Sequence, residues 1–136
     1  MLTHLKKTAD QIGLPFGVRR MTYNSRRAQE LGKWAEQNGY GEAFHKAVFR
    51  AYFAEGKNIA RPSVLLGTVA DIGGDPEDAR RALADSRFKA AVDHDWQRSR
   101  SMGITAVPTF VMSGRHLVGA QTYRDLARFI SQDHGF

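Results

Sequence analysis

The stretch from Gly103 to Met112 constrains the fold of this chain more than any other part of it. Helical periodicity ends at Gly103, and an apolar run typical of a strand follows Pro108. Proline has no N–H to give to a sheet, so within sheets it is confined to edges, strand starts and bulges. We therefore expect a short strand that begins at Pro108 and ends at Met112.

The residues before this stretch follow a helical pattern that is punctuated by capping residues and glycines. We expect helices over about residues 1–12, 25–38, 42–54, 63–72, 75–84 and 86–103, with a short extended segment at 14–18. Asp75 and Ser86 are expected to cap the fifth and sixth of these helices. The apolar stripe of the first helix is Leu2, Leu5, Ala9 and Ile12. The aromatic residues assigned to the core are Phe44, Phe49, Tyr52, Phe53 and Trp96.

After Pro108 the pattern changes to that of a hairpin. We expect strands at Pro108–Met112 and His116–Ala120, joined by a turn at 113–115. Thr122 is expected to cap a last helix, whose apolar residues are Tyr123, Leu126, Ala127, Phe129 and Ile130. One hairpin is too little sheet to be stable alone in water, so other structure must complete it.

Composition excludes several classes of function. The 136 residues contain no cysteine, which excludes disulfides, thiolate metal sites and thiol chemistry by this chain itself. The five histidines, at positions 4, 45, 94, 116 and 134, show no metal-ligand spacing, so we expect no metal and no cofactor. The net charge is +6, but the basic residues are scattered among carboxylates, so we expect no nucleic-acid partner. No apolar run of ~18 residues or signal peptide is present, so we expect a soluble, cytoplasmic protein without a membrane partner.

Four stretches carry a family resemblance. They are Tyr23–Leu31, Ala47–Phe53, Gly56–Ile59, and Gly103–Phe110 together with Gly119–Gln121. In order and spacing they resemble the DsbA-like thioredoxin superfamily, in particular its FrnE-like cytoplasmic branch. The resemblance covers the chain from about Leu2 to Ile130.

The resemblance implies an α/β fold that is mostly α. It implies a truncated thioredoxin-like fold with a DsbA-type helical insertion over 20–102 and a C-terminal hairpin plus helix over 103–131, in a single domain of residues 1–136. It also implies a cis bond before Pro108. Members of the family begin with a strand, a helix bearing Cys-x-x-Cys and a second strand, and this sequence lacks that part. Either a remnant or a fragment of a longer protein fits this pattern.

The same resemblance implies five substrate-side residues. Val107, Pro108 and Thr109 form the loop that faces the substrate in the family, where the peptide groups of Val107 can pair with an extended peptide or with glutathione. The alternative is a tight turn that only aims the hairpin. Asn24 and Ser25 correspond to polar substrate-side residues in relatives, and the alternative is a helix N-cap. No catalytic residue is assigned.

Three functions follow from the resemblance. The first is a thiol–disulfide oxidoreductase of the DsbA-like family that is inactive alone, because the cysteines are absent. The second is a noncatalytic module that binds a peptide or partner at the proline loop. The third is part of a glutathione-dependent enzyme similar to the kappa-class transferases and hydroxychromene-carboxylate isomerases. Because the absent strands leave an apolar edge and face, for example at Phe110 and Leu117, we also expect a homodimer.

Overall fold

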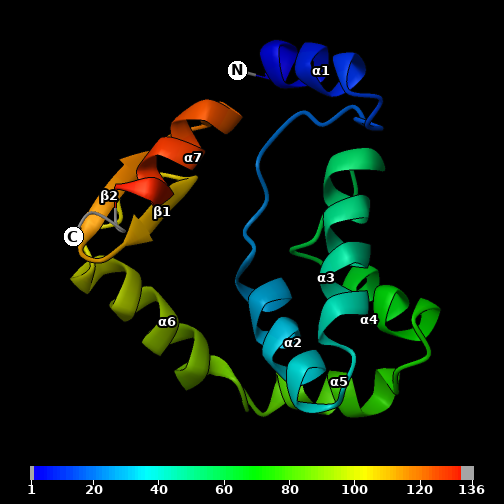
Figure 1. Ribbon diagram of the computed structural model, residues 1–136. Coiled ribbons are helices and arrows are strands. Elements are labelled where there is room, and N and C mark those ends of the chain that lie inside the picture. The colour runs from blue at the N-terminus through cyan, green and yellow to red at the C-terminus, as the bar shows by residue number, and fades with distance from the viewer. Residues whose placement is uncertain (1, 133–136) are drawn as a thin grey trace. The chain divides into compact units, whose positions relative to one another are not determined.

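The computed structural model describes residues 2–132 and shows a mostly helical chain with one antiparallel hairpin (Figure 1). The elements are α1 (Leu2–Gln11), α2 (Arg26–Gln37), α3 (Gly41–Phe49), the π-helix η1 (Arg50–Ala54), α4 (Pro62–Asp71), α5 (Pro76–Ala84), α6 (Lys89–Ser101), β1 (Thr109–Met112), β2 (Arg115–Val118) and α7 (Tyr123–Ser131). Met1 and residues 133–136, including His134 and both ends of the expected single domain, lie outside the described residues. The chain forms two compact units, one up to Asp93 and one from His94, which are described separately below.

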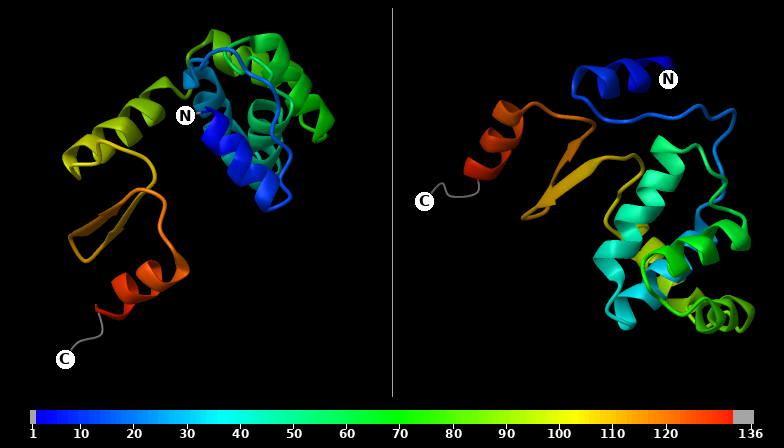
Figure 2. Two further views of the ribbon diagram at one scale, coloured as in Figure 1. Left: turned by 90° about the horizontal axis from the view of Figure 1, so that it is seen from above. Right: turned by 90° about the vertical axis from the view of Figure 1, so that its right-hand side faces the viewer.

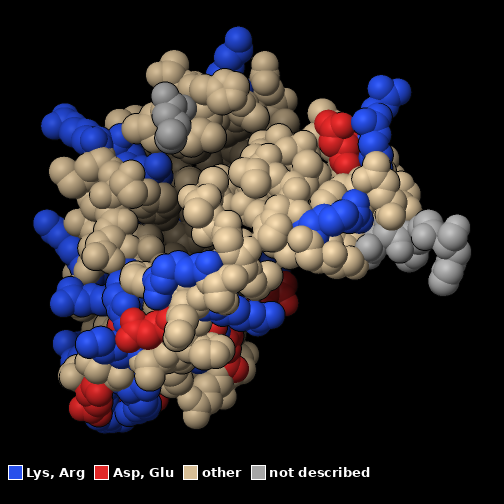
Figure 3. Space-filling view, turned by 90° about the vertical axis from the view of Figure 1, so that its left-hand side faces the viewer, with Lys and Arg blue, Asp and Glu red and all other residues tan. Residues whose placement is uncertain are grey.

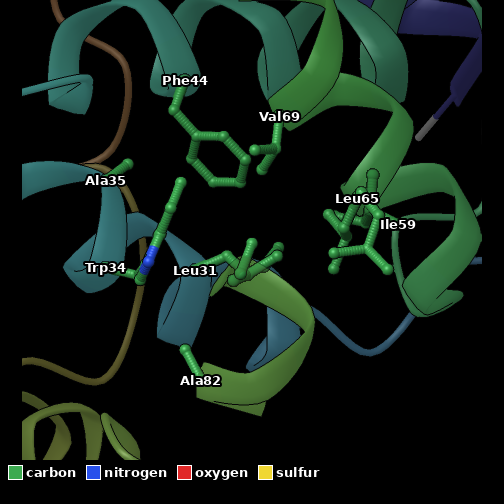
Figure 4. Close-up of a cluster of buried hydrophobic side chains, with 11 residues drawn as sticks. Leu31, Trp34, Ala35, Phe44, Ile59, Leu65, Val69 and Ala82 are labelled. Atoms are coloured by element: carbon green, nitrogen blue, oxygen red, sulfur yellow. The ribbon is translucent and has the colours of Figure 1, made fainter. Parts of the chain in front are cut away.

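The core of the first unit lies between α2, α3, α4 and α5 (Figure 4). Leu31, Trp34 and Ala35 place one face of α2 against this core, at the spacing that brings side chains of a helix to the same side. Trp34 is 1% exposed, and its ring stacks on Tyr40 at a centroid distance of 6.2 Å. Full burial of a large apolar side chain stabilises a fold by about 1.5–3 kcal/mol, so the burial of Leu31 and Phe44 contributes to the stability of this unit.

Capping residues begin two helices as the sequence indicates. Asp75 accepts a 2.9 Å hydrogen bond from the N–H of Glu77, and Pro76 follows at the first helical position of α5. Thr122 accepts a 3.2 Å hydrogen bond from the N–H of Asp125 at the start of α7. These bonds satisfy N–H groups that have no partner inside the helix, and both expected caps are confirmed.

The sixth helix begins later than expected. Ser86, expected to cap it, has a φ of +52° and lies in a turn, where its carbonyl accepts from the N–H of Lys89. The helix α6 starts at Lys89, so the cap expected at Ser86 is wrong. A serine followed by apolar residues at helical spacing does not distinguish a cap from a turn that precedes the helix by three residues.

Of the aromatic residues assigned to the core in the third helix, Phe44 is buried and Tyr52 packs partly buried against the core, whereas the assignments of Phe49 and Phe53 are wrong. The α-helical pattern ends at Phe49, and the chain continues through the wider turn of η1. Phe44 is 1% exposed, whereas Phe49 is 63% exposed and Phe53 36%. A π-turn adds a residue to the turn and so moves the following side chains off the buried stripe. Trp96 in α6 is also exposed rather than in the core.

The first helix also buries less than its pattern indicates. Only Ala9 of the expected stripe is buried, and the larger side chains of that stripe are exposed. The segment after α1 is extended, as expected, and lies against the end of η1. The N–H of Gly17 donates to the carbonyl of Phe53 at 2.7 Å. A Cβ on Gly17 would lie 2.4 Å from the Ala54 carbonyl oxygen, so this close approach requires glycine.

The second unit contains the hairpin, followed by α7 (Figure 2). Thr109 pairs with Val118 and Met112 with Arg115, which leaves Ser113 and Gly114 as a two-residue turn. Both turn residues have positive φ, 48° and 76°, as the tight turns of such hairpins require. The second strand therefore begins one residue before the expected His116 and ends at Val118, before the expected Ala120.

Arg115 connects this hairpin to α7. One terminal nitrogen of Arg115 donates a 2.9 Å hydrogen bond to the carbonyl of Phe129, and the other donates to Gln132 Oε1 at 3.1 Å. The guanidinium also lies over the Phe129 ring, 4.8 Å from its centroid. These contacts hold the C-terminal end of α7 beside β2.

Candidate functional site

The loop before β1 has the backbone geometry that the sequence indicates. The helix α6 is closed by Gly103, whose φ is +70°, and the Val107–Pro108 bond is cis, as expected. The carbonyl of Pro108 accepts a 2.8 Å hydrogen bond from the N–H of Gly119. Thr109 Oγ1 donates to the carbonyl of Ala106 at 2.6 Å, which closes the loop from the other side. The loop is therefore fixed on both sides of the proline.

Val107 projects from this fixed loop. Its side chain is 90% exposed. Among residues 2–132, neither its N–H nor its C=O has a hydrogen-bond partner. A backbone donor and acceptor held open side by side can pair with an extended chain in the way that a sheet edge does. The loop can thus form two backbone hydrogen bonds with a ligand, through the N–H and the C=O of Val107.

Two side chains that were not predicted as site residues bond to backbone carbonyls near the ends of the elements that flank this loop. His116 Nε2 lies 2.7 Å from the carbonyl of Met102, which joins β2 to the end of α6. Gln121 Nε2 donates to the carbonyl of Val118 at 2.8 Å. Gln121 belongs to one of the stretches that carry the family resemblance, so the sequence could have indicated a role for it. No sequence signal marks His116, because its partner is a backbone carbonyl.

Asn24 and Ser25 lie in the first unit, whereas the proline loop lies in the second. Asn24 Oδ1 accepts a 2.9 Å hydrogen bond from the N–H of Arg26, and Ser25 Oγ accepts from Gln29 Nε2 at 2.9 Å. The oxygen of Asn24 therefore satisfies a first-turn N–H of α2, whereas Ser25, the N-cap residue, makes no side-chain cap hydrogen bond, so the capping interpretation holds for the side chain of Asn24 only. A role of Asn24 and Ser25 toward a substrate stays a prediction.

Arg26, next to these two residues, is held in an ion-pair network. It bonds Asp93 at 2.6 Å and Glu30 at 3.1 Å, and it also donates to the carbonyl of Lys89. The hydrogen bonds to Asp93, and then to Glu30, raise the pKa of Arg26 above its ordinary value. Arg27 donates to the carbonyl of Ala60 at 3.3 Å. The contacts of Arg26 and Arg27 tie α2 to neighbouring segments.

Charge elsewhere is mixed. Figure 3 shows Lys and Arg side chains interleaved with Asp and Glu over the charged part of one face. Within residues 2–132, no three His, Asp or Glu side chains are grouped closely enough to hold a metal ion. In the same range, no helix combines the length and apolar character that crossing a bilayer requires.

Three comparisons relate this chain to known proteins. The family model of the DSBA-like thioredoxin domain matches residues 1–131. The Bacillus subtilis (strain 168) protein YwbO is 28% identical over 91 residues, which are 64% of this chain and 44% of that protein. The cytosolic disulfide reductase DsbM from Pseudomonas aeruginosa, solved with GSH, superposes with a TM-score of 0.66 at 23% identity.

The superposition with DsbM covers 96% of this chain and 73% of that chain. This chain thus spans less than half the length of its curated relative YwbO and about three quarters of the structural one. The architecture, mostly helical with a two-stranded antiparallel sheet, matches a DsbA-like thioredoxin fold. Since the family model covers almost every residue, the chain belongs to the DSBA-like thioredoxin domain family.

Proposed function

We propose that this chain supplies the substrate-binding loop of a DsbA-like thiol–disulfide oxidoreductase, and that an extended peptide pairs with the backbone of Val107. The observation that carries the proposal is the pair of open peptide groups on Val107, beside a proline whose carbonyl is bonded to Gly119. A loop fixed on both sides loses little conformational freedom when it binds, and that favours affinity. Thr109 holds the loop in place and is the first residue of β1, one residue after the expected start at Pro108.

The proposed role of this chain is binding rather than exchange. Thiol–disulfide exchange begins with the attack of a thiolate on a disulfide sulfur. The 136 residues contain no cysteine to supply that thiolate. Exchange at this loop therefore requires a cysteine from another segment or another protein. The disulfide reductase activity named for DsbM supports this assignment to the oxidoreductases.

The proposal also covers the branch of the family to which the chain belongs and the cellular compartment in which it acts. We assign the chain to the FrnE-like branch on its quoted stretches, and to the cytoplasm. DsbM is named as a cytosolic protein, which supports the compartment.

Binding and exchange are separated by two assays on the same preparation. Insulin B chain with blocked thiols is the peptide probe, and its binding is followed by amide shifts in an NMR titration. The proposal expects saturable shifts at 103–110 and 119–121, and no acceleration of insulin reduction by dithiothreitol. Faster reduction would overturn the binding-only role, and an absence of shifts at the loop would overturn the substrate loop.

A second candidate ligand is glutathione. The neighbouring structure of DsbM was solved with GSH, and a tripeptide can pair with the same two groups of Val107. S-methylglutathione is the probe, because it cannot exchange. Loop shifts with this probe, together with none from the B chain, would favour the glutathione-dependent function over the peptide-binding one.

The proposal includes a homodimer. Both edges of the two-stranded sheet lack a strand partner among residues 2–132, and unpaired edges favour association. No residue of α7 is buried, and Tyr123, Leu126 and Ile130 line an open hollow beside it. We expect a second copy to cover these groups. Light scattering coupled to size exclusion should give a dimer at micromolar concentration, and a monomer would contradict this part of the proposal.

A further inference from the structure

A separate feature of the first unit is an arginine whose guanidinium lies over an aromatic ring. The guanidinium carbon of Arg19 lies 4.0 Å from the centroid of Tyr52 and 5.5 Å from that of Phe53. The segment that carries Arg19 is fixed by backbone contacts on either side of Val18. Gly17 bonds the carbonyl of Phe53, and a Cβ on Gly56 would lie 2.4 Å from the Val18 carbonyl oxygen.

This guanidinium has no polar partner in the described part of the chain. Within residues 2–132, Arg19 makes neither an ion pair nor a hydrogen bond, and its Nε is buried without an acceptor. Stacking alone therefore holds the group in place. A guanidinium that stacks through its face keeps its terminal N–H groups free along its edge, and two such groups match the two oxygens of a carboxylate.

Three phenylalanine rings are in contact beside Arg19, and two of them are exposed. Phe49 stacks on Phe53 with a centroid distance of 5.9 Å and an interplanar angle of 11°. The ring of Phe16 is tilted by 39° against that of Phe53, with a centroid distance of 6.5 Å. Phe49 is 63% exposed and Phe53 36%, although burying them would be favourable. Adjacent exposed rings of this kind form an apolar surface that a flat ligand can cover.

We propose that Arg19, Phe53 and Phe49 form a binding site for a small aromatic carboxylate. The carboxylate pairs with the terminal nitrogens of Arg19, and the ring system lies over the two phenylalanines. Charge complementarity selects an anion, because within residues 2–132 no carboxylate pairs with Arg19, whose Nε is buried without an acceptor. The site lies wholly within the first unit and does not depend on the function of the proline loop.

The test compares 2-naphthoate with 2-naphthamide, which has the same shape without the charge. In an NMR titration, 2-naphthoate should shift the Nε–H signal of Arg19 and the amide of Gly17 in a saturable way. The amide compound should bind about tenfold more weakly, since it lacks the charge-assisted hydrogen bonds. Equal affinities for the two compounds, or saturation only at α7, would overturn the proposal.

Matched variants locate the site. Arg19→Gln should weaken 2-naphthoate about tenfold and leave 2-naphthamide unchanged, whereas Arg20→Gln, with the same charge change one residue on, should alter neither. Phe53→Leu should weaken both compounds. The thermal unfolding midpoint of each variant, compared with that of the unmodified chain, shows whether a weaker affinity results from a loss of folded structure. An equal loss of affinity in the Arg19 and Arg20 variants would show a general charge effect and contradict the site.

Discussion

The carbonyl of Pro108 accepts a 2.8 Å hydrogen bond from the N–H of Gly119, so the residue before β1 is tied to the residue after β2. This bond extends the pairing of the hairpin by one step beyond Thr109 and Val118. The ladder stops there, and the next residue, Val107, is left with both peptide groups open. The end of the ladder is thus also the start of the candidate binding edge.

The contact between the segment before α2 and the end of η1 makes a prediction about glycine. Gly17→Ala should destabilise the first unit by about 1–3 kcal/mol, because the new Cβ would lie 2.4 Å from the Ala54 carbonyl oxygen. Gly67→Ala is the control, since it lies inside α4 with open space around the new Cβ. It should stabilise by about 0.5–1 kcal/mol. Urea unfolding measures both changes, and equal effects would show that the close approach is unimportant.

The hydrogen bond between Trp34 and Asp78 predicts a dependence of stability on pH. Trp34 Nε1 donates to Asp78 Oδ2 at 2.7 Å, and this bond is the main cause of a lowered pKa at Asp78, with Arg87 adding to it. A carboxyl whose pKa is lower in the folded state binds protons more readily when unfolded. Its contribution to stability is therefore complete above the ordinary value of 3.8 and is lost as the pH falls through the lower, folded pKa.

Asp78→Asn keeps an oxygen acceptor for Trp34 and removes the titration. The free energy of unfolding of the unmodified chain should therefore fall more steeply than that of the variant as the pH drops below about 4. Chemical denaturation at a series of pH values measures both slopes. Parallel pH profiles would contradict the account of Asp78. Glu55, whose pKa is lowered by Lys57 and then by Arg50, titrates in both proteins and cancels in the comparison.

The contacts of Arg115 predict the stability of α7. Arg115→Ala removes the hydrogen bonds to Phe129 and Gln132 and should accelerate amide exchange across 126–131 by about fivefold to tenfold. Arg124→Ala, an exposed position on α7 with the same charge change, should leave these rates within about twofold. Hydrogen exchange followed by NMR measures both. Unchanged exchange in the Arg115 variant would mean that the apolar contacts of α7 suffice without it.

Sequence patterns were sufficient where a residue acts on its immediate neighbours. Asp75 and Thr122 cap the helices that follow them, and Gly103 closes α6 with a positive φ, because each effect is confined to one turn of chain. The hairpin was predictable for the same reason, although its turn is Ser113 and Gly114 rather than the expected residues 113–115, because Arg115 already pairs in β2. The cis bond before Pro108 was predicted from the family resemblance rather than from the local sequence.

Sequence patterns failed where the outcome depends on distant contacts. The aromatic spacing around Phe49 and Phe53 is typical of a buried helix face, but both rings are exposed, and the π-turn accounts for this only at Phe53, which lies within it. The position of Arg19 over Tyr52 requires the approach of Gly17 to residues 53 and 54, which lie more than thirty residues away. Periodicity carries no information about such a contact, so the proposed aromatic carboxylate site was invisible in the sequence.

The central claim, that Val107 pairs with an extended peptide through its backbone, is tested most directly by comparing two substitutions at that position. Val107→Pro removes the N–H and should weaken the binding of thiol-blocked insulin B chain about fivefold to tenfold, the cost of a lost hydrogen bond. Val107→Ala keeps both peptide groups and should bind within about twofold of the unmodified chain. Slow exchange of the Gly119 amide, which reports the bond to Pro108, verifies that the loop is intact in each protein. Equal affinity of all three proteins for the B chain would contradict the claim.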